Sequence, residues 1–365
     1  MILKNISILY GSDLKFIEST DVKIRNKKFQ NISPQIISFK EKVLDCKGLL
    51  LIPGLINAHT HIGDSIGKDL SLNSDVDSRI HPVSGIKQKI LAETPKKELE
   101  KFMRKSAISM LKKGITTFVD FREGGIEGIQ LLKNAIKGNP IRSIILGRID
   151  YYQTRTDIQK NTSMPESYKL ELKSLLRNCD GVGISGANEN SDSNLNTYSK
   201  IKKLRAIHAA ETAQSYSISQ KITRRSEPLR ALFAKPTFLV HMTFATKNDL
   251  RKISKNIRGI VICPRANAAL AEGIPNIVLM DKMNCNVALG TDNVMINSPD
   301  LFREMDYLWK VSMALHKKRI DPKTILKMGT VNAGKLLDQK IGVIRKGFLA
   351  DCIFCLLYTS PSPRD

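Results

Sequence analysis

Short apolar runs alternate with amphipathic stretches along most of the chain, from about residue 49 to residue 338. The runs are rich in Ile, Leu and Val, as is typical of strands buried in a parallel sheet, and the stretches between them have helical spacing. The expected strands are residues 50–57, 115–120, 142–149, 181–185, 204–208, 237–241, 259–263 and 286–289. Eight strands that alternate with helices predict an α/β fold, a closed (β/α)8 barrel of the TIM type.

Two of the expected helices have clear start signals. Thr94 is a suitable N-cap and Pro95 suits the first helical position, and apolar residues then follow at helical spacing up to Gly114. A second helix is expected to begin at Ser298-Pro299. Both signals support the alternation of strands and helices on which the barrel prediction depends.

The two ends of the chain have a different pattern. Residues 1–48 read as short strands (2–9, 21–24 and 36–39) separated by polar turns, and residues 339–354 have the same character. Because these β-rich ends flank the barrel, we expect them to pair into one small β-sandwich domain. The expected division is therefore 1–48 and 339–354 for the small domain and 49–338 for the barrel.

The last eleven residues, 355–365, do not fit this pattern. Their sequence, CLLYTSPSPRD, resembles the translation of a transposon-end sequencing adaptor. We expect this segment to be an artefact, with the natural protein continuing past Phe354, and we exclude it from fold reasoning.

Candidate metal ligands stand at the ends of the expected strands. Four of the six histidines in the chain belong to this set: His59 and His61 in PGLINAHTH, His208 in IHAAET and His241 in FLVHMT. Asp292 in ALGTDN completes it. Because the carboxyl ends of barrel strands meet at one mouth, these side chains are expected to converge there. Imidazoles and a carboxylate suit a divalent metal such as zinc or iron that activates water, which predicts a hydrolase.

Glu211 follows His208 at three residues and is a candidate proton carrier. The alternative is a charge partner for a helix N-terminus, a common use of Glu after a strand. His241 is expected either to bind the metal or to lie one shell out, where it orients the water and stabilises developing charge. Asp292 is expected to bind the metal and to accept a proton from the water.

The composition of the chain does not change the prediction of a metal-dependent hydrolase. The net charge of +23 is compatible with a nucleic-acid-binding surface, but the lysines are spread along the chain without interleaved aromatics, which favours an ordinary solvated surface. The cysteines before residue 355 are scattered and lack CxxC spacing, so no disulfide framework or zinc–cysteine module is indicated. We see no signal peptide and no membrane-spanning stretch, and we expect a cytoplasmic protein.

The motifs PGLINAHTH, HAAE, the histidine that ends the sixth strand, CPRAN and GTDN together resemble the amidohydrolase superfamily. The branch that they resemble contains cytosine deaminases, chlorohydrolases and nucleoside-type deaminases. The resemblance covers residues 1–354 and implies one metal ion, zinc in the first instance, held by His59, His61, His208 and Asp292. It also implies Glu211 as the proton shuttle and His241 as a catalytic residue outside the ligand set. Members with two metals carry a bridging lysine at the end of strand four, and GVGISGANE has none.

Other residues near the mouth have no assigned role. Each is expected either to orient the substrate or to form a salt-bridged rim. The loop 62–93, with Asp64, Lys68, His81 and Lys87, is expected either to cover the pocket and form part of it or to be an ordinary surface excursion. The remaining candidates are Arg122, Glu123, Arg148, Asp150, Arg265 and Asn267.

The function expected from the sequence is hydrolytic deamination of a small nitrogen heterocycle at a metal-activated water. One alternative is an amidohydrolase that opens a cyclic amide or imidazolone ring. Another is a non-catalytic, basic nucleic-acid-binding protein. The expected partner is a small-molecule substrate, with no membrane and no nucleic acid. The sequence leaves open the substrate, the choice of zinc or iron, and whether the chain forms a homo-oligomer.

Overall fold

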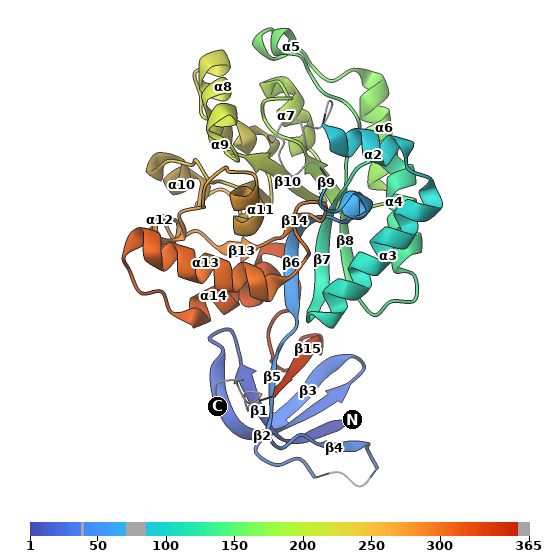
Figure 1. Ribbon diagram of the computed structural model, residues 1–365, viewed down its shortest axis with the longest axis vertical. Helices are drawn as coiled ribbons and strands as arrows, with labels where there is room; N and C mark the ends of the chain where they lie inside the picture. The colour runs from blue at the N-terminus through green and yellow to red at the C-terminus, as the bar shows by residue number, and fades with distance from the viewer. Residues whose placement is uncertain (38–39, 71–84, 357–365) are drawn as a thin grey trace.

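A computed structural model describes residues 1–37, 40–70 and 85–356 of the 365-residue chain. Figure 1 shows the central strands, among them β6, β7 and β8, with helices around them and a smaller sheet below. No helix in the described part of the chain is both long and apolar enough to cross a membrane.

The large sheet is parallel and returns to its own first strand. Its order is β13-β12-β11-β10-β9-β8-β7-β6-β14. β13 and β14 are separated only by Gly290 and Thr291, and β14 pairs with β6. The described strands therefore occupy eight positions, which confirms a TIM-like barrel. The bounds are β6 Leu55–His61, β7 Ile115–Arg122, β8 Arg142–Gly147, β9 Gly181–Ile184, β10 Leu204–Ala209, β11 Phe238–His241, β12 Gly259–Ile262, β13 Val287–Leu289 and β14 Asp292–Asn293.

Helices cover the outside of the ring (Figure 1). The bounds are η1 Ile62–Gly67, α2 Ile86–Glu93, α3 Lys96–Lys112, α4 Gly125–Ile136, α5 Arg155–Gln159, α6 Glu166–Leu176, α7 Asp192–Ser199, α8 Ala213–Thr223, α9 Glu227–Ala231, η2 Leu232–Ala234, α10 Lys247–Ile253, α11 Pro264–Ala269, α12 Ile277–Lys282, α13 Leu301–His316, α14 Pro322–Met328 and α15 Val331–Leu337.

Two helix starts differ from the sequence prediction. Pro95, expected at the first helical position, is instead the N-cap of α3, and Thr94 is the C-cap of α2. The expected start at Ser298-Pro299 is also early, because the Asp300 side chain accepts from the Arg303 N–H and α13 begins at Leu301. A side chain that accepts from an N–H of the first turn fixes the boundary more strongly than the preceding proline does.

The barrel interior forms a floor beneath its mouth. Apolar side chains from successive strands fill it, including Phe121, Phe238 and Val240. The Phe121 ring lies edge-on to His59, with ring centroids 4.4 Å apart, and 5.0 Å from His208. A Cβ at Gly183 would lie 2.5 Å from the Phe121 ring, so glycine at this position leaves the space that the ring occupies.

The small sheet contains strands from both ends of the described chain. Its order is β15-β5-β1-β2-β3, and β4 pairs with β1 on another path. A second sheet facing it, as a β-sandwich requires, is not found among the described residues. The bounds are β1 Ile2–Tyr10, β2 Lys15–Arg25, β3 Lys28–Ser33, β4 Val43–Asp45, β5 Leu49–Pro53 and β15 Cys352–Leu356. The expected strand 36–39 lies partly outside the described residues, as do residues 357–365 of the segment expected to be an artefact.

The single strand expected over residues 50–57 is wrong, because the chain changes sheets within it. β5 belongs to the small sheet and β6 to the barrel, with Gly54 between them. The Gly54 N–H donates to the Asp351 carbonyl at 2.8 Å, and a Cβ at this position would lie 2.3 Å from Thr116 Oγ1. The crossing therefore requires glycine, and the barrel begins at Leu55.

Candidate metal centre

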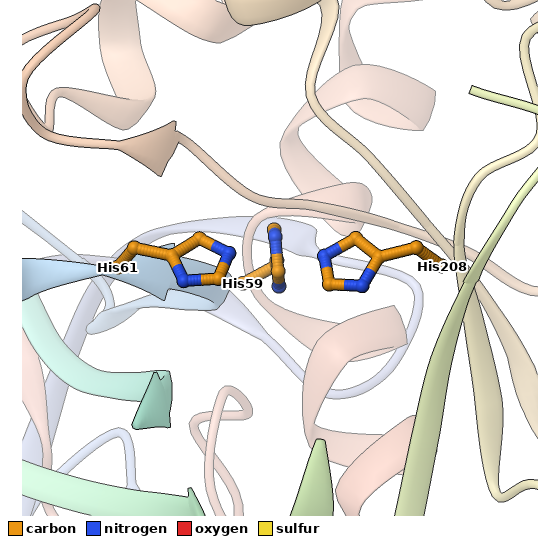
Figure 2. Close-up of side chains that lie close together, drawn as sticks. All are labelled: His59, His61 and His208. Atoms are coloured by element: carbon orange, nitrogen blue, oxygen red, sulfur yellow. The ribbon is translucent and has the colours of Figure 1, made fainter. Parts of the chain in front are cut away.

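Four histidines and one aspartate meet at the carboxyl ends of the barrel strands. Figure 2 shows the imidazole of His59 between those of His61 and His208. The centroid of the His59 ring lies 4.9 Å from that of His61, 5.0 Å from His208 and 5.8 Å from His241. Asp292 Oδ1 lies 3.1 Å from His59 Nε2. The structure thus brings together all five residues that the sequence pattern selected.

Two subsets have the spacing that a metal ion needs. One nitrogen from each of His59, His61 and His208 lies within 4.8 Å of the others, and the same holds for ligand atoms of His59, His241 and Asp292. His59 belongs to both subsets, so they describe one centre. His241 offers a ligand atom within 4.8 Å of those of His59 and Asp292, so it lies close enough to bind a metal at this centre.

Hydrogen bonds between the first and last strands align the ligands. Asn57 Nδ2 donates to Thr291 Oγ1 at 2.7 Å, and the Thr291 N–H donates to Asn57 Oδ1 at 3.1 Å. Thr60 Oγ1 donates to the Asp292 carbonyl at 3.0 Å. The backbone at Asp292 has φ 58°, a left-handed conformation that is costly for a residue with a Cβ. These bonds hold Asp292 in that conformation, with its carboxylate beside His59.

Burial controls the protonation of the centre. It lowers the pKa of His59 to about 3, which Asp292 offsets only in part, and it holds the pKa of His208 well below the ordinary value. Burial alone would raise the pKa of Asp292, but the hydrogen bond with His59 and the nearby histidines bring it below its usual range. His59 and His208 are therefore neutral and Asp292 is ionised at neutral pH, the forms in which these groups bind metal.

The centre contains polar atoms that have no partner among the described residues. His59 Nδ1, Asp292 Oδ2 and Glu211 Oε1 are buried and make no hydrogen bond there. Leaving such atoms unsatisfied costs about 1–3 kcal/mol each. Neutral imidazoles and a carboxylate with a free oxygen are suitable ligands for zinc or iron(II), so the residues fit a divalent metal ion.

Glu123 makes the hydrogen bond that orients His61. Its Oε1 accepts from His61 Nδ1 at 2.7 Å, which leaves His61 Nε2 on the side of Asp292, 3.6 Å from Oδ1. The same carboxylate pairs with Lys87 at 2.6 Å and with Arg122 at 2.8 Å. Burial would raise the pKa of Glu123, but Lys87 and His61 lower it well below its ordinary value. Glu123 is therefore an ionised partner of a candidate ligand, a role that its sequence position did not reveal.

Glu211 lies beside His241 at the edge of the centre. Glu211 Oε2 is 3.5 Å from His241 Nε2, and burial raises the pKa of Glu211. On the other side of the His241 ring, Nδ1 lies 3.4 Å from Asn267 Oδ1. Asn267 also donates to Thr243 Oγ1 at 3.1 Å. Asn267 therefore contacts His241, whereas its sequence position had left its role open.

The loops around the mouth are held by two further buried carboxylates. Asp64 accepts from Asn293 Nδ2 at 2.6 Å and from the Met295 N–H at 3.1 Å, which joins η1 to the segment after β14. Glu304 accepts from the Arg265 N–H at 3.1 Å and pairs with its guanidinium at 3.3 Å. Arg265 is thus part of a brace between α11 and α13.

The other predicted mouth residues make fewer contacts with the candidate centre. Arg148 Nη2 lies 3.7 Å from Glu123 Oε1, and both Nη2 and Nε are buried without a hydrogen bond in the described part of the chain. Lys68 pairs with Asp69 near the surface. Asp150 is exposed, and His81 lies outside the described residues.

Comparison with known proteins shows similarity along nearly the whole chain. The profile of the Amidohydrolase family matches residues 50–363. A putative aminohydrolase of Methanothermobacter thermautotrophicus is 35% identical over 361 residues, which cover 97% of this chain and 90% of that protein. A 5-methylthioadenosine/S-adenosylhomocysteine deaminase of Thermococcus sibiricus is 26% identical, with 97% and 84% covered. The crystal structure of an adenosine deaminase from Xanthomonas campestris with bound zinc superposes with a TM-score of 0.81 at 19% identity, covering 98% of this chain and 84% of that one.

The contact between Glu123 and His61 predicts an effect on metal affinity. Replacing Glu123 by Gln removes the charge that makes His61 a stronger ligand, and loss of such a partner typically weakens binding about 10–100-fold. Competition with a chelator measures this affinity directly. Glu127→Gln is the matched control, because Glu127 pairs with Lys96 at the surface. Equal affinities in the two variants would contradict the role of Glu123.

The burial of Glu304 predicts a pH effect on stability. Burial raises its pKa to about 8, against the opposing effect of Arg265, whereas an unfolded Glu titrates near about 4.3. The folded state therefore keeps a proton that the unfolded state loses, and this contribution to stability disappears as the pH rises through about 8. Between pH ~5 and ~8 the free energy of unfolding should fall in the wild type relative to Glu304→Gln. Urea unfolding of both proteins across this range measures the difference, and parallel curves would exclude it.

Proposed function

The chain belongs to the amidohydrolase family, and we propose that its metal centre deaminates a small nitrogen heterocycle by hydrolysis. The observation that carries this proposal is the position of Glu211. Its carboxylate lies beside His241, one of its oxygens has no hydrogen bond among the described residues, and burial raises its pKa. A carboxyl group in this state is suited to carry a proton between water, a ring nitrogen and a departing amine.

The relatives support an amino-substituted heterocycle as the substrate. The similar proteins include one named for the deamination of methylthioadenosine and S-adenosylhomocysteine, and a structural neighbour is an adenosine deaminase. Both names describe removal of an amino group from a purine. We therefore propose a purine-like or pyrimidine-like substrate, and zinc in preference to iron because that neighbour contains zinc.

We propose His59, His61, His208 and Asp292 as the metal ligands. The burial of His59, His61 and Asp292 supports this set, as do the protonation states of His59, His208 and Asp292. When bound, the metal supplies Lewis acidity that lowers the pKa of water toward neutrality. The aromatic floor beneath the centre, which includes Phe121, shields one side from bulk solvent.

The remaining steps use side chains of the chain itself. Asp292 Oδ2 is free of hydrogen bonds in the described residues and is available to accept a proton from the attacking water. His241 lies between Asn267 and Glu211 and stabilises the negative charge that develops on the attacked carbon's oxygen. Glu211 protonates a ring nitrogen, takes up the hydroxyl proton of the tetrahedral adduct and donates it to the departing amine. Asp292 then returns the proton of the attacking water to Glu211, so that water and the amino compound give a carbonyl compound and ammonia and both carboxyl groups regain their starting forms.

Metal analysis and ammonia release together test the proposal. We expect about one equivalent of zinc or iron per chain, and ammonia from at least one of methylthioadenosine, S-adenosylhomocysteine, adenosine, guanine and cytosine. A ring-opened acid without ammonia, from a cyclic amide substrate, would replace deamination by the alternative hydrolysis. A folded protein that binds no divalent metal would contradict the whole assignment.

Two variants separate metal binding from proton transfer. Glu211→Gln should retain the metal and lower kcat by about 10²–10⁴-fold, because it removes a positioned proton carrier. Asp292→Asn should lower both metal content and kcat, because it removes a ligand. Elemental analysis and steady-state kinetics on the same preparations measure both quantities. Loss of metal from the Glu211 variant would show that this residue is a ligand instead.

A further inference from the structure

We propose that Glu227 is a positioning residue that fixes the backbone between His208 and Glu211 and so determines where the Glu211 carboxylate lies. The inference rests on the proposed function, in which Glu211 carries the proton. Glu227 is the first residue of α9, and no sequence motif distinguishes it. Its side chain is buried, with 4% of the residue exposed.

The Glu227 carboxylate holds the chain directly before Glu211. Its Oε2 accepts from the Ala210 N–H at 2.8 Å and from Ser215 Oγ at 2.9 Å. Ala210 is the residue that follows β10, and Ser215 lies in the first turn of α8. One oxygen atom therefore fixes both ends of the short connection on which Glu211 stands.

The backbone of this connection needs support. Ala210 has φ 50°, in the left-handed region, which is unfavourable for a residue with a Cβ. Two backbone bonds reach the connection from the other side, since the Met242 N–H donates to the Ala209 carbonyl and the Phe244 N–H to the Ala210 carbonyl, each at 3.0 Å. In both of these bonds the connection supplies the accepting carbonyl oxygen. The Ala210 N–H, by contrast, donates to Glu227.

Glu211 has little else to fix its position. Its Oε1 makes no hydrogen bond within the described residues, and Oε2 lies 3.5 Å from His241 Nε2, beyond ordinary hydrogen-bond length. A side chain without anchors of its own takes its position from its backbone. A displacement of Ala210 would therefore move the Glu211 carboxylate relative to the centre, and a misplacement of about 1 Å can cost about 10²-fold in rate.

The helix that carries Glu227, α9, is itself held by hydrogen bonds to neighbouring elements. Ser226 Oγ donates to Asp249 Oδ1 at 2.5 Å. Arg230, buried in the same helix, donates to the carbonyls of Ala187 and Asn190 at 2.8 and 2.6 Å. The start of α9 is thus tied to α10 and to the segment after β9, so it is a fixed point for the connection after β10.

The test compares Glu227→Ala with Glu227→Gln. Burial raises the pKa of Glu227 to about 7, so the carboxyl group is partly neutral at this site and a neutral Gln is a conservative replacement. The Gln oxygen can still accept a hydrogen bond from the Ala210 N–H. We expect Glu227→Ala to lower kcat about 10–100-fold, with KM and metal content little changed. Glu227→Gln should stay within about threefold of the wild type.

Asp21→Ala is the matched control for a general loss of stability. Asp21 is also a buried carboxylate that accepts from backbone N–H groups, those of Asn5 and Ile36, but it lies in the small sheet. This variant should lower the melting temperature and leave kcat of the folded enzyme unchanged. A similar loss of kcat in Asp21→Ala and Glu227→Ala would overturn the proposal.

The double variant asks whether Glu227 acts through Glu211. If it does, adding Glu227→Ala to Glu211→Gln should lower kcat no further, because the group that it positions is already absent. Multiplicative losses would instead show that Glu227 acts independently, which contradicts the proposal.

A readout without substrate separates this inference from the proposed function. Hydrogen exchange at the Ala210 amide should be slow in the wild type and Glu227→Gln and at least tenfold faster in Glu227→Ala. Absence of hydrolysis in the wild type would refute the proposed function, while faster exchange would still support the anchoring of Ala210. Unchanged exchange in Glu227→Ala would overturn the positioning role whatever the activity.

Discussion

The closure of the barrel between β14 and β6 is the constraint on which the metal centre depends. His59 and His61 lie on the first strand and Asp292 on the last, so these proposed ligands meet only when the two edges are paired. The reciprocal bonds between Asn57 and Thr291 fix the register of that pairing next to the centre itself. A shift of one residue would turn the histidine pair away from the mouth, because successive strand side chains point to opposite faces.

Carboxylates outside the ligand set give the mouth its shape. Glu123 holds a ligand ring, Asp64 joins two loops, Glu304 braces Arg265, and Glu227 holds the connection after β10. All four are buried, and burial opposes their ionisation. Glu123 forms ion pairs with Lys87 and Arg122 and accepts from His61, and it alone among the four has a lowered pKa. Buried carboxyl groups therefore have a lowered pKa in one place and a raised pKa in another, according to their neighbours.

Local pattern was sufficient for the barrel and for the residues that the centre uses. The apolar runs end at His59, His208 and His241, and strand ends in a barrel face one mouth, so their convergence followed from topology alone. The change of sheets at Gly54 was not predicted, because apolar residues stand on both sides of it. The group that the Gly54 N–H contacts, the Asp351 carbonyl, lies far along the chain. Glu227 was missed for a similar reason. Its partner, the Ala210 N–H, is a backbone group that no side-chain motif can mark, and the role of Glu123 depends on a neighbour 62 residues earlier.

The same closure has a consequence for biosynthesis. His59 and Asp292 are separated by 233 positions, so β6 leaves the ribosome long before the strand that covers its second edge. Until β14 pairs with it, one edge of β6 has no partner strand, and an unpaired strand edge favours association between chains. The contacts of the centre are among the longest-range contacts of the fold, and such contacts form late. Assembly of the proposed metal centre is therefore a late event in folding, because its residues meet only when β14 pairs with β6.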